Sequence, residues 1–114
     1  MKQVYPTFIL KVEDSSEHPF LVCVPDMDIF TEGDTFADAL EMARDAIGLT
    51  GISMEDQKEE IPAPSDQDTA IKKVQQDTEI VDFSKGILTY VDVDVSEYRK
   101  KVDTKTVRRN VAVP

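Results

Sequence analysis

The most informative part of this 114-residue chain is residues 29–49, which read IFTEGDTFADALEMARDAIGL. The stretch begins with strand-forming residues, is broken by Gly33, and continues with apolar residues at helical spacing. One face of this predicted helix carries Phe36, Leu40, Ala43 and Ile47. Thr35 followed by Asp38 resembles a capping box, with Asp34 as an alternative N-cap. The pattern predicts a short strand that leads into an amphipathic helix packed on a sheet.

This helix is expected to weaken from Gly48 onward. Gly48 and Gly51 lower its propensity, and a second short helix is predicted from Ser53 until the proline-containing segment IPAPS stops it. Residues 65–78 are polar and show no clear period, so we expect a variable connection or a loose turn of helix there.

Two strands are predicted before residues 29–49. In the first, the apolar residues share one parity, which predicts a single buried face: Val4, Pro6, Phe8, Leu10 and Val12. The run from Phe20 to Val24 is apolar on both parities, as in a strand covered on two sides. A hairpin is the simplest connection between these two strands.

The C-terminal third predicts a brief strand at EIVDF and a longer strand from Gly86. In the longer strand Val91, Val93 and Val95 share one face, while Asp92 and Asp94 share the other. Together the predicted elements indicate an α+β fold. We expect a mixed or antiparallel sheet of three to four strands, with one main helix packed on one face.

Acidic and basic residues are unevenly distributed along the chain. Residues 1–98 hold 22 acidic and 7 basic residues, a net charge of −15, whereas residues 99–114 hold 1 acidic and 6 basic residues, a net charge of +5. We therefore expect a folded domain over 1–98 and a basic appended region over 99–114. The acidic domain favours a basic protein partner, and the basic region favours phosphates. The sequence contains neither a signal-peptide pattern nor a long apolar run, so a cytoplasmic protein with no membrane partner is expected.

Few residues suggest catalysis. Asp92 and Asp94 project to one side of a strand, where paired carboxylates hold a divalent cation or share a proton; the simpler interpretation is the polar face of an exposed strand. His18 is the only histidine, and Cys23 lies in the apolar run FLVCV, where a small buried hydrophobe is expected. The chain has no phosphate-binding loop, CxxC or HExxH motif. We predict no catalytic residue, no metal and no cofactor. A carboxylate-metal-dependent nuclease or hydrolase is the alternative.

The order of several segments resembles the HicB family of antitoxins. Over most of the chain the segments run YPTFILKVED, FLVCVPDMDIFTEGDTFADALEMARDAIGL, IPAPS, ILTYVDVDVSEYRKK and VRRNVAVP. The resemblance implies a partial RNase H-like domain without the catalytic carboxylates, which binds and neutralises a small basic HicA-like toxin that cleaves mRNA. The candidate toxin-binding residues surround the strand before the helix: Asp26, Asp28, Glu32 and Asp34. An orphan regulator without a toxin shares all of these features and stays open.

In one branch of that family a ribbon-helix-helix domain follows, whose strands pair across a dimer and contact operator DNA. The segment RRNVAVP resembles this ribbon, and period-two geometry places Arg108, Asn110 and Ala112 on one side of it. These side chains suit contacts with guanine, adenine and the thymine methyl group. The sequence stops at Pro114, where the helices of the ribbon-helix-helix unit are expected to begin, so in this form we expect poor operator binding. Pairing of the ribbon predicts a homodimer or higher oligomer. The alternative is a solvated basic tail.

Overall fold

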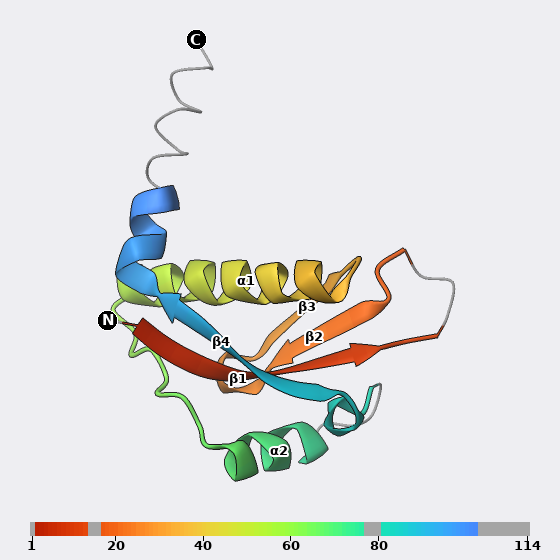
Figure 1. Cartoon of the computed structure of the whole chain (residues 1–114). Coiled ribbons are helices and arrows are strands. Elements are labelled where there is room, and N and C mark those ends of the chain that lie inside the picture. Colours follow the sequence, from red (N-terminus) through yellow and green to blue (C-terminus); the bar gives the residue numbers. More distant parts are fainter. Residues whose placement is uncertain (1, 14–16, 77–80, 103–114) are drawn as a thin grey trace.

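The computed structural model describes residues 2–13, 17–76 and 81–102. Its strands are β1 (Lys2–Lys11), β2 (Phe20–Val24), β3 (Ile29–Gly33) and β4 (Ile87–Asp94). They form one sheet in the order β3-β2-β1-β4, with every neighbouring pair antiparallel. Two helices, α1 (Phe36–Asp56) and α2 (Gln67–Gln76), lie on opposite faces of this sheet (Figure 1). The predicted α+β fold is confirmed, and the sheet is antiparallel.

The first face of the sheet is covered by α1, and the predicted N-terminal cap is present. Thr35 Oγ1 accepts a hydrogen bond from the Asp38 N–H at 3.0 Å, and Asp38 Oδ2 accepts one from the Asp34 N–H at 2.9 Å. The core beneath α1 joins the helix to all four strands: Tyr5, Ile9, Val22, Val24, Met27, Ile29, Ala39, Ala43, Ile47, Val91 and Val93. The predicted helical stripe therefore packs on the sheet, with Phe36 and Leu40 at the border of this core.

The second face is covered by α2, which the sequence pattern did not predict as a regular helix. Ala70 and Val74 of α2 are buried with Phe8, Cys23 and Phe83 in a separate core. The prediction that β1 has a single buried face is therefore wrong. Strand β1 is buried on both faces, because α2 covers the second one. Two well-spaced apolar residues in a polar segment are enough to form this covering helix. The double-sided burial predicted for β2 is confirmed.

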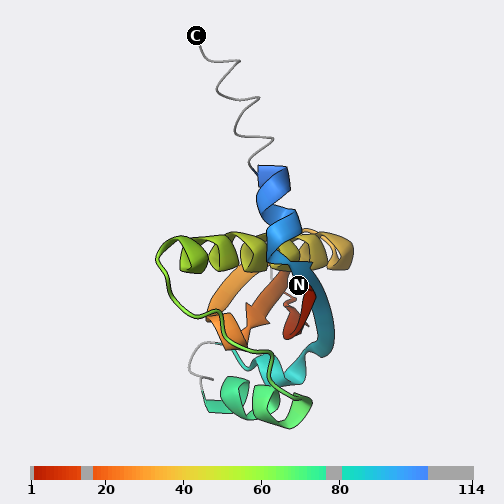
Figure 2. The same cartoon turned by 90° about the vertical axis from the view of Figure 1, so that its left-hand side faces the viewer.

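One continuous helix replaces the two that were predicted between residues 36 and 61. Gly48 and Gly51 are both buried inside α1, which ends only at Asp56. The glycines face a further helical segment, residues 95–102, through the side chains of Tyr98 and Val95. Figure 2 shows this segment rising from the end of β4 beside α1. The close approach of a second helix explains glycine at these positions.

The brief strand predicted at EIVDF is not a strand in its described part. Residues 81–82 are irregular, and the short 3-10 helix η2 (Phe83–Lys85) follows. Phe83 turns into the second core, so its apolar character reflects burial. The alternation predicted for β4 is confirmed over Val91 and Val93, which are buried, whereas residue 95 already belongs to the helical segment.

Candidate functional site

Strand β3 is one edge of the sheet and presents an acidic and aromatic surface. Asp28, Phe30 and Glu32 are exposed, whereas Ile29 and Gly33 are buried. Phe30 pairs with Cys23 and Glu32 pairs with Leu21 of β2. Both partners belong to the α2-side core, so Phe30 and Glu32 point to the face of the sheet that α2 only partly covers. Among the described residues, the carboxylates of Asp28 and Glu32 make no hydrogen bond or ion pair.

Asp34 continues this surface beyond the end of β3. Its carboxylate contacts Nδ1 of His18, and both side chains are exposed. The hydrogen bond to Asp34 raises the pKa of His18 above its ordinary value, with smaller contributions from the charges of Glu32 and Glu17. We call Asp28, Glu32 and Asp34 the β3 carboxylates. At about 3.3 Å per residue they span roughly 20 Å along the sheet edge.

Beside Phe30 lies a half-open pocket of about 390 Å³, which we call the β3–α2 pocket. Phe30 and Asp28 line it from β3 and the residue before it, and Lys73 and Val74 line it from α2. Phe83 of η2 completes an aromatic pair with Phe30, with ring centroids 6.0 Å apart. Phe30 is 61% exposed, so its ring is accessible to a partner at the pocket.

Asp26 differs from the three β3 carboxylates because its side chain is fully buried. It lies in η1 (Pro25–Met27), and its carboxylate accepts hydrogen bonds from the Ser65 N–H at 2.7 Å and from Lys73 Nζ at 2.7 Å. Burial alone would raise the pKa of Asp26, but the hydrogen bonds from Lys73 and Ser65 outweigh burial and hold it below its usual value. Asp26 thus ties η1 to α2 and to the segment before α2. It offers no exposed carboxylate to a partner.

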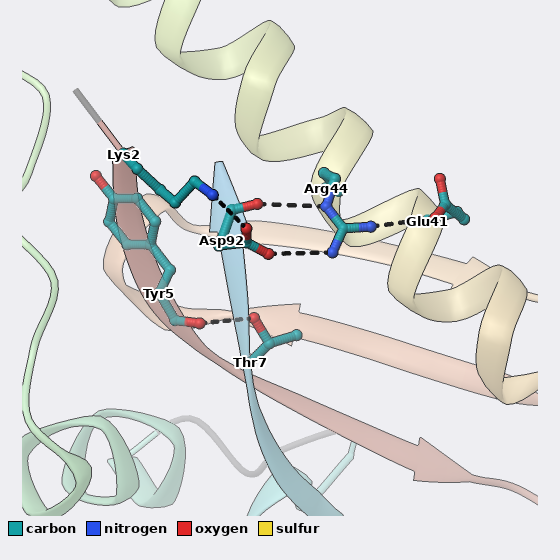
Figure 3. Close-up of polar contacts among 6 residues, drawn as sticks. All are labelled: Lys2, Tyr5, Thr7, Glu41, Arg44 and Asp92. Carbon is teal, nitrogen blue, oxygen red and sulfur yellow. Dashed lines mark hydrogen bonds and ion pairs between the residues drawn. The ribbon is translucent and has the colours of Figure 1, made fainter. Parts of the chain in front are cut away.

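Asp92 connects β4 to α1, as Figure 3 shows. Arg44 reaches over from α1, with Nη2 3.3 Å from Asp92 Oδ1 and Nε 3.3 Å from the Asp92 carbonyl oxygen. Lys2 Nζ lies 3.4 Å from Asp92 Oδ2, and Arg44 also contacts Glu41. The hydrogen bond from Arg44 lowers the pKa of Asp92 most, and Lys2 adds to the effect. The carboxylate is therefore paired with cationic side chains of this chain.

Asp94 has a different role from Asp92, although both lie on the same side of β4. Its Oδ1 accepts the Glu97 N–H at 3.3 Å, at the start of the helical segment 95–102, and this bond lowers the pKa of Asp94. Within residues 2–13, 17–76 and 81–102, no group of three His, Cys, Asp or Glu side chains is placed to hold a metal ion. The described helices also include none long and apolar enough to cross a membrane.

Two further sequence predictions concern Cys23 and the basic C-terminal region. Cys23 is buried and 3% exposed, which confirms its expected place among the apolar side chains. Arg108, Asn110 and Ala112, the predicted base-contacting residues, lie outside the described residues.

The pocket residues Phe30, Lys73 and Phe83 were not singled out from the sequence. Lys73 was missed because the pattern of residues 65–78 predicts only a variable connection or a loose turn of helix. The available signals were a phenylalanine that shares one parity with Asp28 and Glu32 in an edge strand, and the Ala70/Val74 spacing of a helix face.

Comparison with known proteins gives consistent matches. A family model described as "HicB_like antitoxin of bacterial toxin-antitoxin system" matches residues 5–114. An uncharacterised 14.9 kDa protein in the rep-hol intergenic region of Haemophilus phage HP1 is 32% identical over 112 residues, covering 97% of this chain and 73% of the phage protein.

Two solved structures share the fold. A toxin–antitoxin complex from Streptococcus pneumoniae contains a chain with 30% identity and a TM-score of 0.70, and the match covers 86% of this chain and 73% of that one. A HicA3 and HicB3 toxin–antitoxin complex contains a chain with 27% identity and a TM-score of 0.57, and the match covers 81% of this chain and 99% of that one.

Proposed function

The chain belongs to the HicB-like antitoxin family of bacterial toxin–antitoxin systems, and we propose that it binds and neutralises a small basic HicA-like toxin that cleaves mRNA. The observation that carries this proposal is the family match together with two structural neighbours taken from toxin–antitoxin complexes. The mechanism is steric: the acidic domain docks on the basic surface with which the toxin binds RNA. The protein acts in the cytoplasm, where the toxin meets mRNA.

The β3 carboxylates are the part of the acidic domain that we propose meets the toxin. Asp28 and Glu32 are exposed and make no ion pair within the described residues, so neither needs to break an internal contact before it binds. A line of carboxylates about 20 Å long suits a row of several lysine or arginine side chains. Such charges accelerate and select the encounter more than they add to the final affinity.

The protein serves in this proposal as a binding scaffold and not as a nuclease. A metal-dependent nuclease needs carboxylates that converge on a cation. The alternative built on Asp92 and Asp94 is disfavoured because Asp92 is paired with Arg44 and Lys2 while Asp94 caps a helical segment.

Residues 99–114 supply the second part of the proposal, which is autoregulation through operator DNA in a protein with a complete ribbon-helix-helix domain. Six basic residues and one acidic residue in this region support a contact with phosphates. Arg108, Asn110 and Ala112 are the proposed base-contacting residues, in a ribbon formed by two chains of a homodimer or higher oligomer.

The experiment is co-expression with the short open reading frame adjacent to this gene, scored for co-purification and for loss of RNA cleavage by its product. Replacing the β3 carboxylates together (Asp28→Asn, Glu32→Gln, Asp34→Asn) is expected to slow association about tenfold or more at low salt and to flatten its salt dependence. The matched control removes three exposed carboxylates elsewhere (Asp45→Asn, Glu59→Gln, Glu60→Gln). No complex with the wild-type chain, or equal effects of the two triple variants, contradicts the proposal.

A further inference from the structure

We infer that the β3–α2 pocket is an anchor site for a single arginine side chain of the basic partner. The inference rests on the proposed function only for the source of that arginine. Three features of the pocket lining define its chemistry: a carboxylate with no hydrogen-bond or ion-pair partner among the described residues, an exposed aromatic ring and an apolar wall.

Asp28 supplies the charge. Asp28 lines the pocket and is exposed, and its carboxylate has no hydrogen-bond or ion-pair partner within the part of the chain that the structure describes. Its backbone is in the left-handed conformation with φ 52°, and its N–H donates to the Pro25 carbonyl oxygen at 3.4 Å. This turn ends η1 and places Asp28 in the lining of the pocket.

Lys73 also lines the pocket but does not cancel this charge. Its Nζ lies 2.7 Å from Asp26 Oδ1 and 3.1 Å from Ser65 Oγ, so the ammonium group is already satisfied by a buried carboxylate. Asp26 and Lys73 together are neutral, which leaves Asp28 as the net charge of the lining. A cation is therefore the favoured occupant, and an anion is disfavoured.

The aromatic pair makes arginine a better occupant than lysine. Phe30 is 61% exposed at the rim, and its ring lies 6.0 Å from that of Phe83. A planar guanidinium stacks on an aromatic ring while it forms two parallel hydrogen bonds to a carboxylate, whereas an ammonium is a compact, strongly hydrated charge. Val74 and Phe83 provide apolar contacts for the methylene stem.

The size of the pocket agrees with this occupant. Its volume of about 390 Å³ exceeds that of a single water site and lies near the lower end of ligand-sized pockets. The β3 carboxylates Glu32 and Asp34 lie further along the same strand edge, where they meet neighbouring basic residues of the same partner. An arginine in the pocket thus fixes the register of the partner along β3.

The test is an NMR titration of the full isotope-labelled chain with the peptide acetyl-Gly-Arg-Gly-amide at physiological ionic strength. The matched probes replace arginine by citrulline, which has nearly the same shape without the charge, by lysine, and by glutamate. We expect saturable shifts confined to the amides of Asp28, Phe30 and the end of α2 with arginine, weaker ones with lysine, and none with citrulline or glutamate.

Two variants of the chain complete the test. Asp28→Asn and Phe30→Ala are each expected to weaken arginine binding about two- to fivefold. Asp45→Asn, which removes the same charge on the outer side of α1, should leave binding unchanged. Equal binding of citrulline and arginine, preferential binding of glutamate, absence of saturable shifts, or an unaffected Asp28→Asn variant overturns the inference.

These outcomes separate the pocket from the proposed function, because the titration contains no toxin. If the chain binds the arginine peptide but forms no toxin complex, the arginine site is supported and the antitoxin proposal is rejected. If the wild type does not bind the peptide, and Asp28→Asn and Phe30→Ala form the toxin complex as well as the wild type does, the arginine site is rejected and the antitoxin proposal is supported.

Discussion

Gly48 of α1 lies against the ring of Tyr98, so closely that a methyl group added at Gly48 would come within 2.5 Å of Tyr98 Cγ. Gly51 faces Val95 in the same way, at 2.7 Å from Cγ2. Arg99 extends the contact, with Nη2 3.0 Å from Glu55 Oε1 and 2.9 Å from Asp56 Oδ1 at the end of α1. The helical segment 95–102, which includes the first residues of the basic region 99–114, is thereby packed on the domain that carries the β3 carboxylates.

The first prediction concerns this helix contact. Gly48→Ala is expected to lower the free energy of unfolding by about 1–3 kcal/mol, because the added methyl group overpacks against the Tyr98 ring. Alanine is the better helix former by about 1 kcal/mol, so helix propensity alone predicts the opposite sign. Urea unfolding measures the difference. Asp45→Ala, on the exposed side of α1, is the control and should be neutral or slightly stabilising. A more stable Gly48→Ala variant would contradict the packing described above.

The second prediction concerns the buried carboxylate of Asp26. Its folded-state pKa is lowered from 3.8, so its stabilising contribution is complete above that value and is lost as the pH falls through the folded-state pKa. Asp26→Asn is expected to lower the free energy of unfolding at neutral pH by about 1–3 kcal/mol. The variant should also lose less stability than the wild type on acidification below pH 3.8. Urea unfolding across a pH series tests both statements, with Asp45→Asn as control, and parallel curves for wild type and Asp26→Asn would refute the second.

The third prediction concerns His18 and Asp34. The pKa of His18 is raised from 6.5 by its hydrogen bond to Asp34. The contact therefore stabilises the fold fully below pH 6.5, and this contribution disappears as the pH rises through the folded-state pKa. An NMR titration of the only imidazole should give a midpoint above 6.5 in the wild type and a lower one in Asp34→Asn. Asp45→Asn is the charge-matched control, and identical midpoints in all three proteins would rule out the contact.

The fourth prediction concerns the role of α2. Val74 is 5% exposed in the second core, so Val74→Ala is expected to cost about 1–3 kcal/mol of unfolding free energy. Gln75→Ala changes the next, exposed residue of the same helix and should be close to neutral. If residues 67–76 were only a connection, the two variants would unfold at the same urea concentration.

Local sequence patterns were sufficient where a single element determines the geometry. The Thr35–Asp38 cap, the apolar stripe of α1 and the alternation of Val91 and Val93 depend on bond geometry within a few residues, and all three were predicted. The sequence also determines the charge distribution, because the change from an acidic to a basic region after residue 98 does not depend on how the chain folds. The order of the segments was likewise sufficient to identify the family.

Tertiary packing decided the features that depend on which elements meet. By sequence alone, the glycines of α1 predict a weakened helix, but residues 95–102 pack against them. Residues 67–76 predict a variable connection or a loose turn of helix, but Ala70 and Val74 pack against Phe8 and Cys23 and form α2. The same packing separates Asp26 from Asp28, which are only two residues apart. The first turns inward to Ser65 and Lys73 and the second stays exposed, because a side chain's environment is set by neighbours from distant parts of the chain.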